Sequence, residues 1–335
     1  MSFSARWGII GCGDVTEVKS GPAFNKVPGS SLIAVMRRDK EKVEDYAKRH
    51  NVPYWFTDAN ELINHPDINS IYIATPPKFH EEYVLAAIKA GKPVYVEKPM
   101  SVDVASCIRM KEAADKAGVK LCVAHYRRAL PKFIKIKQLL TEKRIGNIRA
   151  VNITLFASDV SEKVSKSWRV DPGLAGAGLF YDLAPHQLDL AIYFFGNAIE
   201  PVGYSANQAR LYPAEDIVTG IAKLENNILL TGTWCFTVAK GLEKDIFEII
   251  GSEGKISFSV FGHEIEIDNG HEKETINFTP PEHIQQPMIE KVVSYFSGID
   301  ENPCSATEAI KSMFVMEQFT YGTKSLTKKF GFTKP

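Results

Sequence analysis

Two pairs of titratable side chains in this chain have types and spacings suited to proton transfer. Glu97 and Lys98 close the strand-like run VYV within residues 92–101, KPVYVEKPMS. Asp182 and His186 stand four residues apart, so they share one face if their segment is helical. A neutral imidazole can accept a proton, a carboxylate can orient that imidazole, and a lysine can stabilise a developing alkoxide. Both pairs are therefore candidates for acid–base chemistry.

The second pair has other interpretations. Asp182 could be a helix N-cap, with His186 a surface residue beside it. A metal site would need more histidine or cysteine at ligand spacing, and only Asp189 lies nearby, so we expect no metal. Pro185 predicts that the pair lies in the first turn of its helix, because proline is tolerated there. The positive end of that helix would then keep the imidazole neutral.

The first third of the chain alternates between strand-like and helical patterns. The clearest helical patterns are Glu81–Ala90 and Val102–Ala117, and the strand-like runs are Trp7–Ile10, Leu32–Met36, Ser70–Ala74, Pro93–Val96 and Lys120–Ala124. This alternation indicates a parallel, doubly wound sheet, which binds ligands at the carboxyl ends of its strands. Glu97 and Lys98 lie at such an end, where a solvated turn would otherwise account for their charges.

The first strand-to-helix turn, GIIGCGDVTEV, resembles a dinucleotide-binding fingerprint. Gly11 and Gly13 would let the backbone approach a pyrophosphate, which the start of the helix at Asp14 and Val15 would also contact. Thr16 takes the place of the third glycine, so the match is incomplete. Taken alone, such a turn is equally consistent with a simple tight connection.

The end of the second strand, LIAVMRRDKEK, indicates which dinucleotide is bound. NAD enzymes usually carry an acidic residue there, whereas this chain has Arg37 followed by Arg38. A guanidinium can bind a 2′-phosphate that an acid would repel, so NADP is favoured and NAD is the alternative. Arg38 could instead lie flat on the adenine, or both arginines could belong to a basic, solvated helix start.

The pattern changes near residue 125. An amphipathic helix at Lys132–Lys143 precedes alternating strands, which are typical of an antiparallel sheet with one apolar and one polar face. These strands are Ile217–Leu224, Asn227–Thr237, Ile246–Ile250, Lys255–Phe261 and Glu264–Asp268. We predict an α/β fold with a Rossmann domain over residues 1–125 and a second α/β domain with a large open antiparallel sheet over residues 126–335. Apart from the last helix, Ser305–Tyr321, nothing obviously covers that sheet, which predicts a homodimer or homotetramer built on it.

Composition excludes several classes of partner. The 335 residues are 44% hydrophobic and 24% charged, and 40 basic residues balance 40 acidic ones. This balance predicts neither a nucleic-acid partner nor an anionic membrane. No apolar run approaches the ~20 residues of a membrane helix. Five cysteines without a C-x-x-C pair argue against a disulfide framework and a zinc ribbon, and favour a reducing, cytoplasmic setting.

Four motifs, in order, resemble the glucose–fructose oxidoreductase and inositol dehydrogenase family, often called Gfo/Idh/MocA. They are the glycine turn, IATPPKFH, VEKP and GLFYDLAPH, and the resemblance extends from Trp7 to about Thr323. It implies a Rossmann domain and an α/β domain whose open sheet often forms a subunit interface. It also implies redox chemistry on a hydroxyl or carbonyl of a sugar, polyol or related compound, with a nicotinamide cofactor.

The resemblance assigns roles to matching positions. Glu97 would lie near the nicotinamide ribose, and Lys98 would contact both cofactor and substrate. Asp182 and His186 match the paired catalytic positions. His186 would therefore accept the proton of the substrate hydroxyl, and Asp182 would orient the His186 imidazole. The remaining matches are Thr75, Pro76 and His80 beside the dinucleotide, and Tyr126, Arg127, Arg128, Trp168 and Arg169 in the substrate pocket. Thr16 and Ala177 depart from the family's glycine patterns, but neither departure removes a reacting group.

Two other functions share this fold. One is a glycosidase that retains its nicotinamide cofactor and hydrolyses by transient oxidation. The other is a sugar-pathway regulator that binds a dinucleotide without catalysis. The presence of Lys98, Asp182 and His186 favours the dehydrogenase or reductase over both.

Overall fold

The structure is a computed structural model that describes residues 3–158 and 162–322. It divides into two compact units that do not follow the order of the sequence. Unit 1 comprises Met1–Leu130 and Pro280–Ile310, and unit 2 comprises Pro131–Thr279 and Lys311–Pro335. The sequence-based boundary assigned all of residues 126–335 to the second domain, whereas the segment Pro280–Ile310 packs with unit 1.

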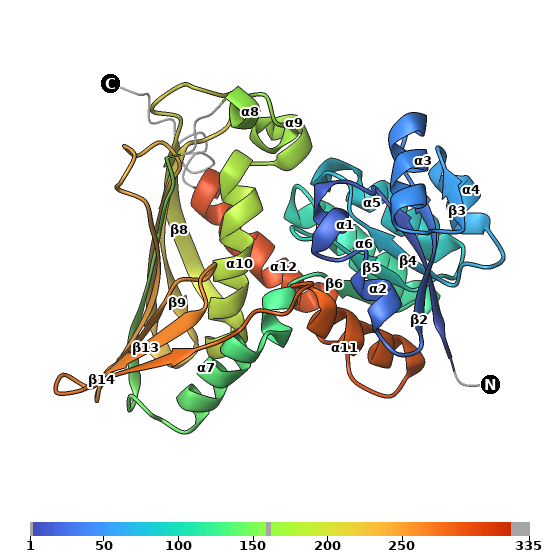
Figure 1. The fold of residues 1–335 in the computed structure, drawn as a ribbon. Helices are drawn as coiled ribbons and strands as arrows, with labels where there is room; N and C mark the ends of the chain where they lie inside the picture. The colour runs from blue at the N-terminus through green and yellow to red at the C-terminus, as the bar shows by residue number, and fades with distance from the viewer. Residues whose placement is uncertain (1–2, 159–161, 323–335) are drawn as a thin grey trace. The chain divides into compact units, whose positions relative to one another are not determined.

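Unit 1 is built on a six-stranded parallel sheet of order β3-β2-β1-β4-β5-β6 (Figure 1). The strands are β1 (Ala5–Ile10), β2 (Ser30–Met36), β3 (Tyr54–Phe56), β4 (Ser70–Ile73), β5 (Val94–Val96) and β6 (Leu121–Val123). All neighbouring pairs are parallel, which confirms the predicted doubly wound sheet. Only β3, three residues long, has no counterpart among the predicted strands.

Helices cover both faces of this sheet. They are α1 (Asp14–Val18), α2 (Ala23–Lys26), α3 (Lys40–Arg49), α4 (Ala59–Asn64), α5 (His80–Lys89), α6 (Val104–Ala117) and α11 (Gln286–Ser297). Trp7 of β1 packs on one face against Phe24 of α2 and Phe296 of α11, with ring centroids 4.8 and 5.5 Å away. The next residue, Gly8, faces the other side, where a Cβ would meet Leu62 of α4. Because α11 supplies part of this core, unit 1 is complete only with the segment Pro280–Ile310.

Unit 2 is built on an eight-stranded sheet of order β14-β13-β12-β11-β7-β10-β9-β8. The strands are β7 (Ile148–Phe156), β8 (Ala198–Ala206), β9 (Ile217–Leu224), β10 (Leu229–Cys235), β11 (Lys244–Gly251), β12 (Lys255–Phe258), β13 (Glu264–Asp268) and β14 (Lys273–Asn277). The sheet is mostly antiparallel, as predicted, but β7 and β10 pair in parallel. The sequence reading missed β7, β8 and β14.

One face of the second sheet is covered by helices of unit 2. These are α7 (Pro131–Thr141) and α10 (Gly178–Phe195), which Figure 1 shows on the same side of the sheet. Phe180 of α10 meets Trp234 of β10 edge to face at 5.1 Å. Phe319, in the π-helical turn η5 (Gln318–Gly322) after α12 (Ala306–Glu317), lies over Gly220 of β9, where a Cβ would be 2.5 Å from its ring. Among the residues described, no helix combines the length and the apolar character needed to cross a membrane.

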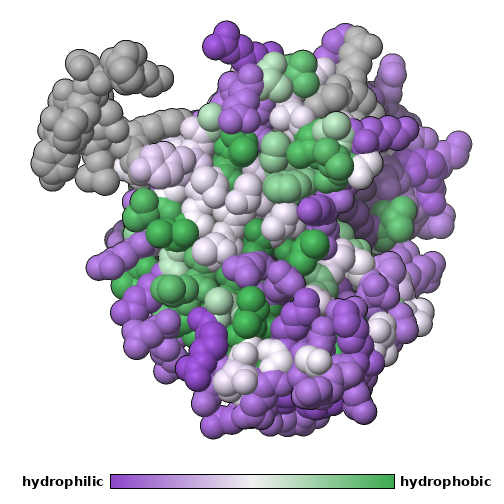
Figure 2. Space-filling view, turned by 90° about the vertical axis from the view of Figure 1, so that its left-hand side faces the viewer, coloured by the Kyte–Doolittle hydropathy of each residue, from purple (hydrophilic) through white to green (hydrophobic). Residues whose placement is uncertain are grey.

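The opposite face of the sheet is exposed and partly apolar. Side chains alternate along β9, so Ile221 is 59% exposed while its neighbours Gly220 and Ala222 are buried. Val202 and Tyr204 of β8 and Leu229 of β10 are also exposed. Figure 2 shows apolar residues grouped on this side of the molecule among hydrophilic ones.

Candidate functional site

The carboxyl ends of the parallel strands in unit 1 gather the predicted cofactor residues. Gly11 and Gly13 follow β1, Arg37 follows β2, Thr75 follows β4 and Glu97 follows β5. β1 lies between β2 and β4, so the strand order reverses at this point. In open α/β sheets, ligands bind in the crevice at such a reversal. The sheet therefore brings these residues to its ligand-binding edge.

The two glycines of the first turn have different structural roles. Gly11 has φ +95°, and a Cβ there would lie 2.8 Å from the main-chain nitrogen of Thr75. This position needs glycine for the fold itself. At Gly13, a Cβ would meet no described atom within 4 Å. That open space, directly before Asp14 and Val15 begin α1, fits the close approach of a phosphate group to the backbone.

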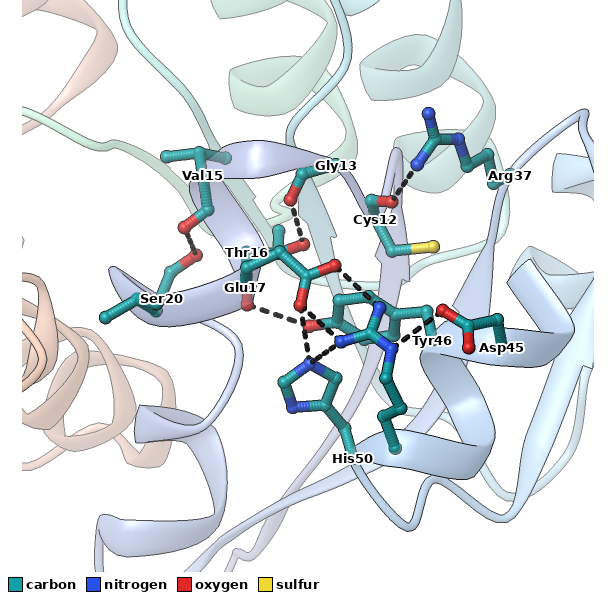
Figure 3. Close-up of polar contacts among 12 residues, drawn as sticks. Cys12, Gly13, Val15, Thr16, Glu17, Ser20, Arg37, Asp45, Tyr46 and His50 are labelled. Carbon is teal, nitrogen blue, oxygen red and sulfur yellow. Dashed lines mark hydrogen bonds and ion pairs between the residues drawn. The ribbon is translucent and has the colours of Figure 1, made fainter. Parts of the chain in front are cut away.

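Thr16 closes the turn from within. Its hydroxyl donates to the carbonyl oxygen of Gly13 at 2.8 Å, and its own carbonyl oxygen accepts from the Tyr46 hydroxyl of α3 at 2.8 Å (Figure 3). Burial raises the pKa of Tyr46, which keeps this hydroxyl protonated as a donor. The departure from a third glycine is therefore accommodated by a buried threonine that ties the turn to α3.

The two arginines after β2 lie differently. Nη1 of Arg37 donates to the Cys12 carbonyl oxygen at 3.2 Å, so the guanidinium lies beside the glycine turn (Figure 3). Arg38 is exposed, and its guanidinium carbon lies 5.2 Å from the centroid of the Phe79 ring. The nearby acid Asp39 is the N-cap of α3 and accepts from a main-chain N–H of that helix. Positive charge thus dominates the end of β2.

His80 joins two loops of the ligand-binding edge. Its Nε2 lies 2.8 Å from the carbonyl oxygen of Thr75, the residue before Pro76. Its Nδ1 lies 3.1 and 3.2 Å from the carbonyl oxygens of Pro99 and Met100. Burial lowers the pKa of His80 to about 4, so the imidazole is neutral at pH 7. His80 is thus a fully buried brace between the loops that follow β4 and β5.

Glu97 is a buried carboxylate surrounded by hydrogen-bond donors. Its Oε1 accepts from the Tyr72 hydroxyl at 2.5 Å and from Nε2 of Gln285 at 2.6 Å. Its Oε2 lies 3.2 Å from the main-chain nitrogen of Lys98. Lys98 follows directly at the end of β5 and is half-buried, and its peptide bond to Pro99 is cis.

The segment after β6 is the 3₁₀ turn η2 (Tyr126–Ala129), which holds the residues matched to a substrate pocket. Tyr126, Arg127 and Arg128 are all buried. The guanidinium of Arg127 lies 5.4 Å from the centroid of the Tyr126 ring. Arg128 pairs with Glu308 of α12 at 3.3 Å, so its charge has a carboxylate partner within unit 1.

In unit 2, α10 carries the second predicted pair. The helix begins at Gly178, so Asp182 is not its N-cap and Pro185 lies inside it. The prediction that the pair lies in the first turn was therefore wrong, as was the argument from the positive helix end. Packing of Phe180 against Trp234 holds the turn that precedes Pro185 and offsets the helical hydrogen bond that the proline lacks.

Asp182 and His186 have identifiable neighbours. Nε of Arg169 lies 3.2 Å from Oδ2 of Asp182, so one residue matched to the substrate pocket pairs with one matched to the catalytic pair. The same guanidinium lies 4.8 Å from the centroid of the Trp168 ring. The His186 ring meets the Phe261 ring edge to face, with centroids 5.6 Å apart. Unit 2 therefore gathers its predicted residues around α10.

The loop that carries Phe261 is firmly held. Nζ of the buried Lys132 donates to the carbonyl oxygens of Ser259 and Gly262, at 2.5 and 2.8 Å. The Phe261 main-chain N–H donates to Oδ2 of Asp245 at 2.7 Å. Phe261 is 38% exposed although its backbone is fixed. A fixed backbone with an exposed aromatic ring indicates that Phe261 is not a core residue and that its ring is available beside His186.

Three residues that no motif indicated contact predicted ones. They are Tyr72 and Gln285, which contact Glu97, and Phe261, which contacts His186. The only sequence signal for Gln285 is its place in HIQQP, directly before the amphipathic α11. Within the described part of the chain, no group of three or more His, Cys, Asp or Glu side chains could hold a metal ion.

Comparisons with known proteins agree with these observations. Residues 5–125 match the family described as "Oxidoreductase family, NAD-binding Rossmann fold", and residues 133–257 match "GFO/IDH/MocA C-terminal domain". An oxidoreductase of Formosa agariphila is 42% identical over 322 residues, covering 95% of this chain and 99% of that protein. The scyllo-inositol 2-dehydrogenase (NADP⁺) of Bacillus subtilis is 31% identical over 189 residues, covering 56% of this chain and 51% of that enzyme. The solved structure of levoglucosan dehydrogenase with NADH and levoglucosan has a TM-score of 0.84 at 21% identity, covering 97% of this chain and 98% of that one, and it shows the same fold.

The two glycines give a test of structural against binding roles. We expect Gly11→Ala to destabilise the fold by ~1–3 kcal/mol, because its Cβ would meet backbone at a left-handed residue. Gly13→Ala should unfold at the wild-type temperature but bind nicotinamide dinucleotide at least about tenfold more weakly, a loss of ~1.4 kcal/mol. Thermal unfolding and titration calorimetry would measure both. Unchanged binding in a folded Gly13→Ala protein would contradict the assignment of this turn.

Proposed function

Because this chain belongs to the Gfo/Idh/MocA family of oxidoreductases, we propose that it transfers a hydride between a nicotinamide cofactor and a hydroxyl or carbonyl carbon of a sugar, polyol or related compound. The observation that supports this most directly is Glu97, a buried carboxylate at the carboxyl end of β5. The strand order of the same sheet reverses at β1, and the glycine turn with its open space at Gly13 follows that strand. Lys98 follows it directly and could serve a reacting oxygen.

The residues at the edge of unit 1 fit a dinucleotide. The turn that Gly11 closes and Gly13 leaves open would receive the pyrophosphate, Arg37 would receive the adenosine end, and Glu97 the nicotinamide ribose. When bound, the nicotinamide ring supplies or accepts the hydride. The protein's own task is to hold the cofactor and to manage the proton of the substrate hydroxyl.

We assign that proton to His186. Its imidazole would accept the proton of the hydroxyl, and Lys98 would stabilise the negative charge that develops on the oxygen. Asp182, one helical turn from His186, pairs with Arg169, so the carboxylate is held beside the base. Phe261 packs against the imidazole edge to face and restricts its rotation.

We further propose that the preferred cofactor is NADP. Arg37 lies beside the glycine turn, and Asp39, the acid that could contact ribose hydroxyls, instead caps α3. A guanidinium favours a 2′-phosphate, whereas two unmodified hydroxyls offer it no charge to pair with. The inositol dehydrogenase relative is itself named for NADP⁺.

Reversing the charge at Arg37 tests the cofactor. Arg37→Asp should weaken NADP binding by ~1.5–3 kcal/mol, because a charge-assisted hydrogen bond is lost, and should improve NAD binding. Arg38→Asp makes the same charge change one residue later and is the matched control, expected to affect both cofactors alike. Dissociation constants for both cofactors would be measured by protein fluorescence. Equal use of NADP and NAD by the wild-type protein would contradict the assignment.

Removal of the proposed acid–base groups tests the chemistry. Lys98→Met and His186→Asn should each lower kcat and kcat/KM together by about 10²–10⁴-fold on an accepted sugar or polyol, because both groups act in the transition state. The double variant should be much less than multiplicatively worse if the two act in one step. His263→Asn, an exposed histidine of the same unit, is the control.

Cofactor binding separates this result from misfolding. NADP should still quench the fluorescence of His186→Asn, since the cofactor residues belong to unit 1. Near-normal turnover in His186→Asn on a verified substrate would show that His186 is not the base. Steady reduction of free NADP⁺ by the substrate would distinguish a dehydrogenase from a cofactor-retaining hydrolase.

We also propose a homodimer or homotetramer built on the exposed face of the second sheet. Ile221, Tyr204 and Leu229 would be buried there, which removes apolar surface from water. Ile221→Glu should lower the mass measured by light scattering from a multiple of 37.3 kDa toward one chain. Ile299→Glu is the control, since Ile299 is 78% exposed in unit 1. A wild-type monomer well above micromolar concentration would overturn this proposal.

A further inference from the structure

The segment just before α11 lies across elements that carry the cofactor residues. The main-chain N–H of Gln285 donates to the carbonyl oxygen of Lys19 at 3.1 Å, directly after α1. Nδ1 of His283 lies 2.7 Å from the carbonyl oxygen of Val18. Glu282 pairs with Lys26 of α2 at 2.6 Å. Residues 282–285, from the far part of the chain, are therefore tied by backbone and side chain to the end of α1.

The side chain of Gln285 extends from this segment into the core of unit 1. It is fully buried, and its Nε2 donates to Oε1 of Glu97 at 2.6 Å. Its Oε1 lies 3.5 Å from the Tyr95 hydroxyl, which can donate to it. The amide thus presents its NH₂ group to the Glu97 carboxyl group and its oxygen to the Tyr95 hydroxyl. The orientation of the amide is therefore set by its two partners.

Gln285 and Tyr72 hold the same oxygen of Glu97. Burial, followed by the nearby charge of Glu97, raises the pKa of Tyr72 well above its ordinary value, so this hydroxyl remains a donor. With Oε1 held by two side-chain donors, the carboxylate cannot rotate about its last bond without breaking them. Oε2 is then presented at the carboxyl end of β5, beside the Lys98 amide.

We infer that Gln285 is a positioning residue for the nicotinamide half of the cofactor, acting through Glu97. This inference rests on the proposed function, in which Glu97 receives the nicotinamide ribose. Toward α1, Gln285 contributes its main-chain N–H, which donates to the Lys19 carbonyl oxygen, whereas its side chain is directed to Glu97 and Tyr95. Removal of the side-chain amide should therefore weaken binding of the nicotinamide half of the cofactor and leave binding of the pyrophosphate and adenosine half unchanged.

The test compares two ligands on the full-length protein. Gln285→Leu keeps a similar volume but donates no hydrogen bond, and calorimetry would measure the binding of NADP⁺ and of 2′-phospho-ADP-ribose, which lacks nicotinamide. We expect the dissociation constant of NADP⁺ to rise about tenfold or more, since the bond to a charged group is lost, and that of the analogue to stay within about twofold. If the wild-type protein prefers NAD, NAD⁺ and ADP-ribose replace this pair.

Gln286→Leu is the matched control. It makes the same chemical change one residue later, where the amide donates to Glu290 on the exposed side of α11. Both ligands should bind this variant as they bind the wild type. Glu97→Gln completes the design: if Gln285 acts through Glu97, the double variant Gln285→Leu/Glu97→Gln should bind NADP⁺ no more weakly than Glu97→Gln alone.

Each outcome decides the question. Equal weakening of NADP⁺ and its analogue would reduce Gln285 to a structural residue and overturn the inference, as would unchanged binding of both. If Gln285→Leu fails to fold, Gln285→Met, which likewise donates no hydrogen bond to Glu97, replaces it and should give the same selective loss. A wild-type protein that binds neither dinucleotide would overturn the proposed function as well, whereas wild-type binding with no selective loss overturns only the role of Gln285.

Discussion

A buried carboxylate is costly unless donors surround it, and much of unit 1 is arranged around the one at Glu97. Its donors come from three parts of the chain: Tyr72 of β4, the adjoining Lys98 amide, and Gln285 before α11. No stretch of consecutive residues could supply them. The sheet must set β4 beside β5, and the chain must return after residue 280 to complete the set. The site and the discontinuous unit are thus consequences of the same requirement.

Parallel strand geometry accounts for the placement of the other predicted cofactor residues. Gly11, Arg37, Thr75 and Glu97 are far apart in sequence, yet each follows a strand that points the same way. Once the strands are known to be parallel and their order is given, these residues must lie at the same edge of the sheet. This is why the position of the glycine turn and of the arginine after β2 at this edge could be predicted from sequence, and why the α/β alternation predicted most strands of unit 1.

The features that sequence reasoning missed depend on distant contacts. Gln285 acts on a residue 188 positions away, and nothing in HIQQP indicates that partner. Pro185 suggested a helix start, but packing of Phe180 on Trp234 extends α10 back to Gly178. The parallel pairing of β7 with β10 likewise joins strands whose local alternation is the same in either direction. Local pattern predicts element type well, whereas tertiary packing decides boundaries and partners.

The return of Pro280–Ile310 to unit 1 also bears on synthesis of the protein. The first 130 residues leave the ribosome while the face of β1 that carries Trp7 still lacks α11. At about 5–20 residues per second, the ~150 residues up to Pro280 take roughly 8–30 s to make. Throughout that interval an aromatic surface around Trp7 and Phe24 stays open to water and Glu97 lacks one donor. During synthesis, all six strands of the unit 1 sheet are therefore made before α11 is available to cover Trp7.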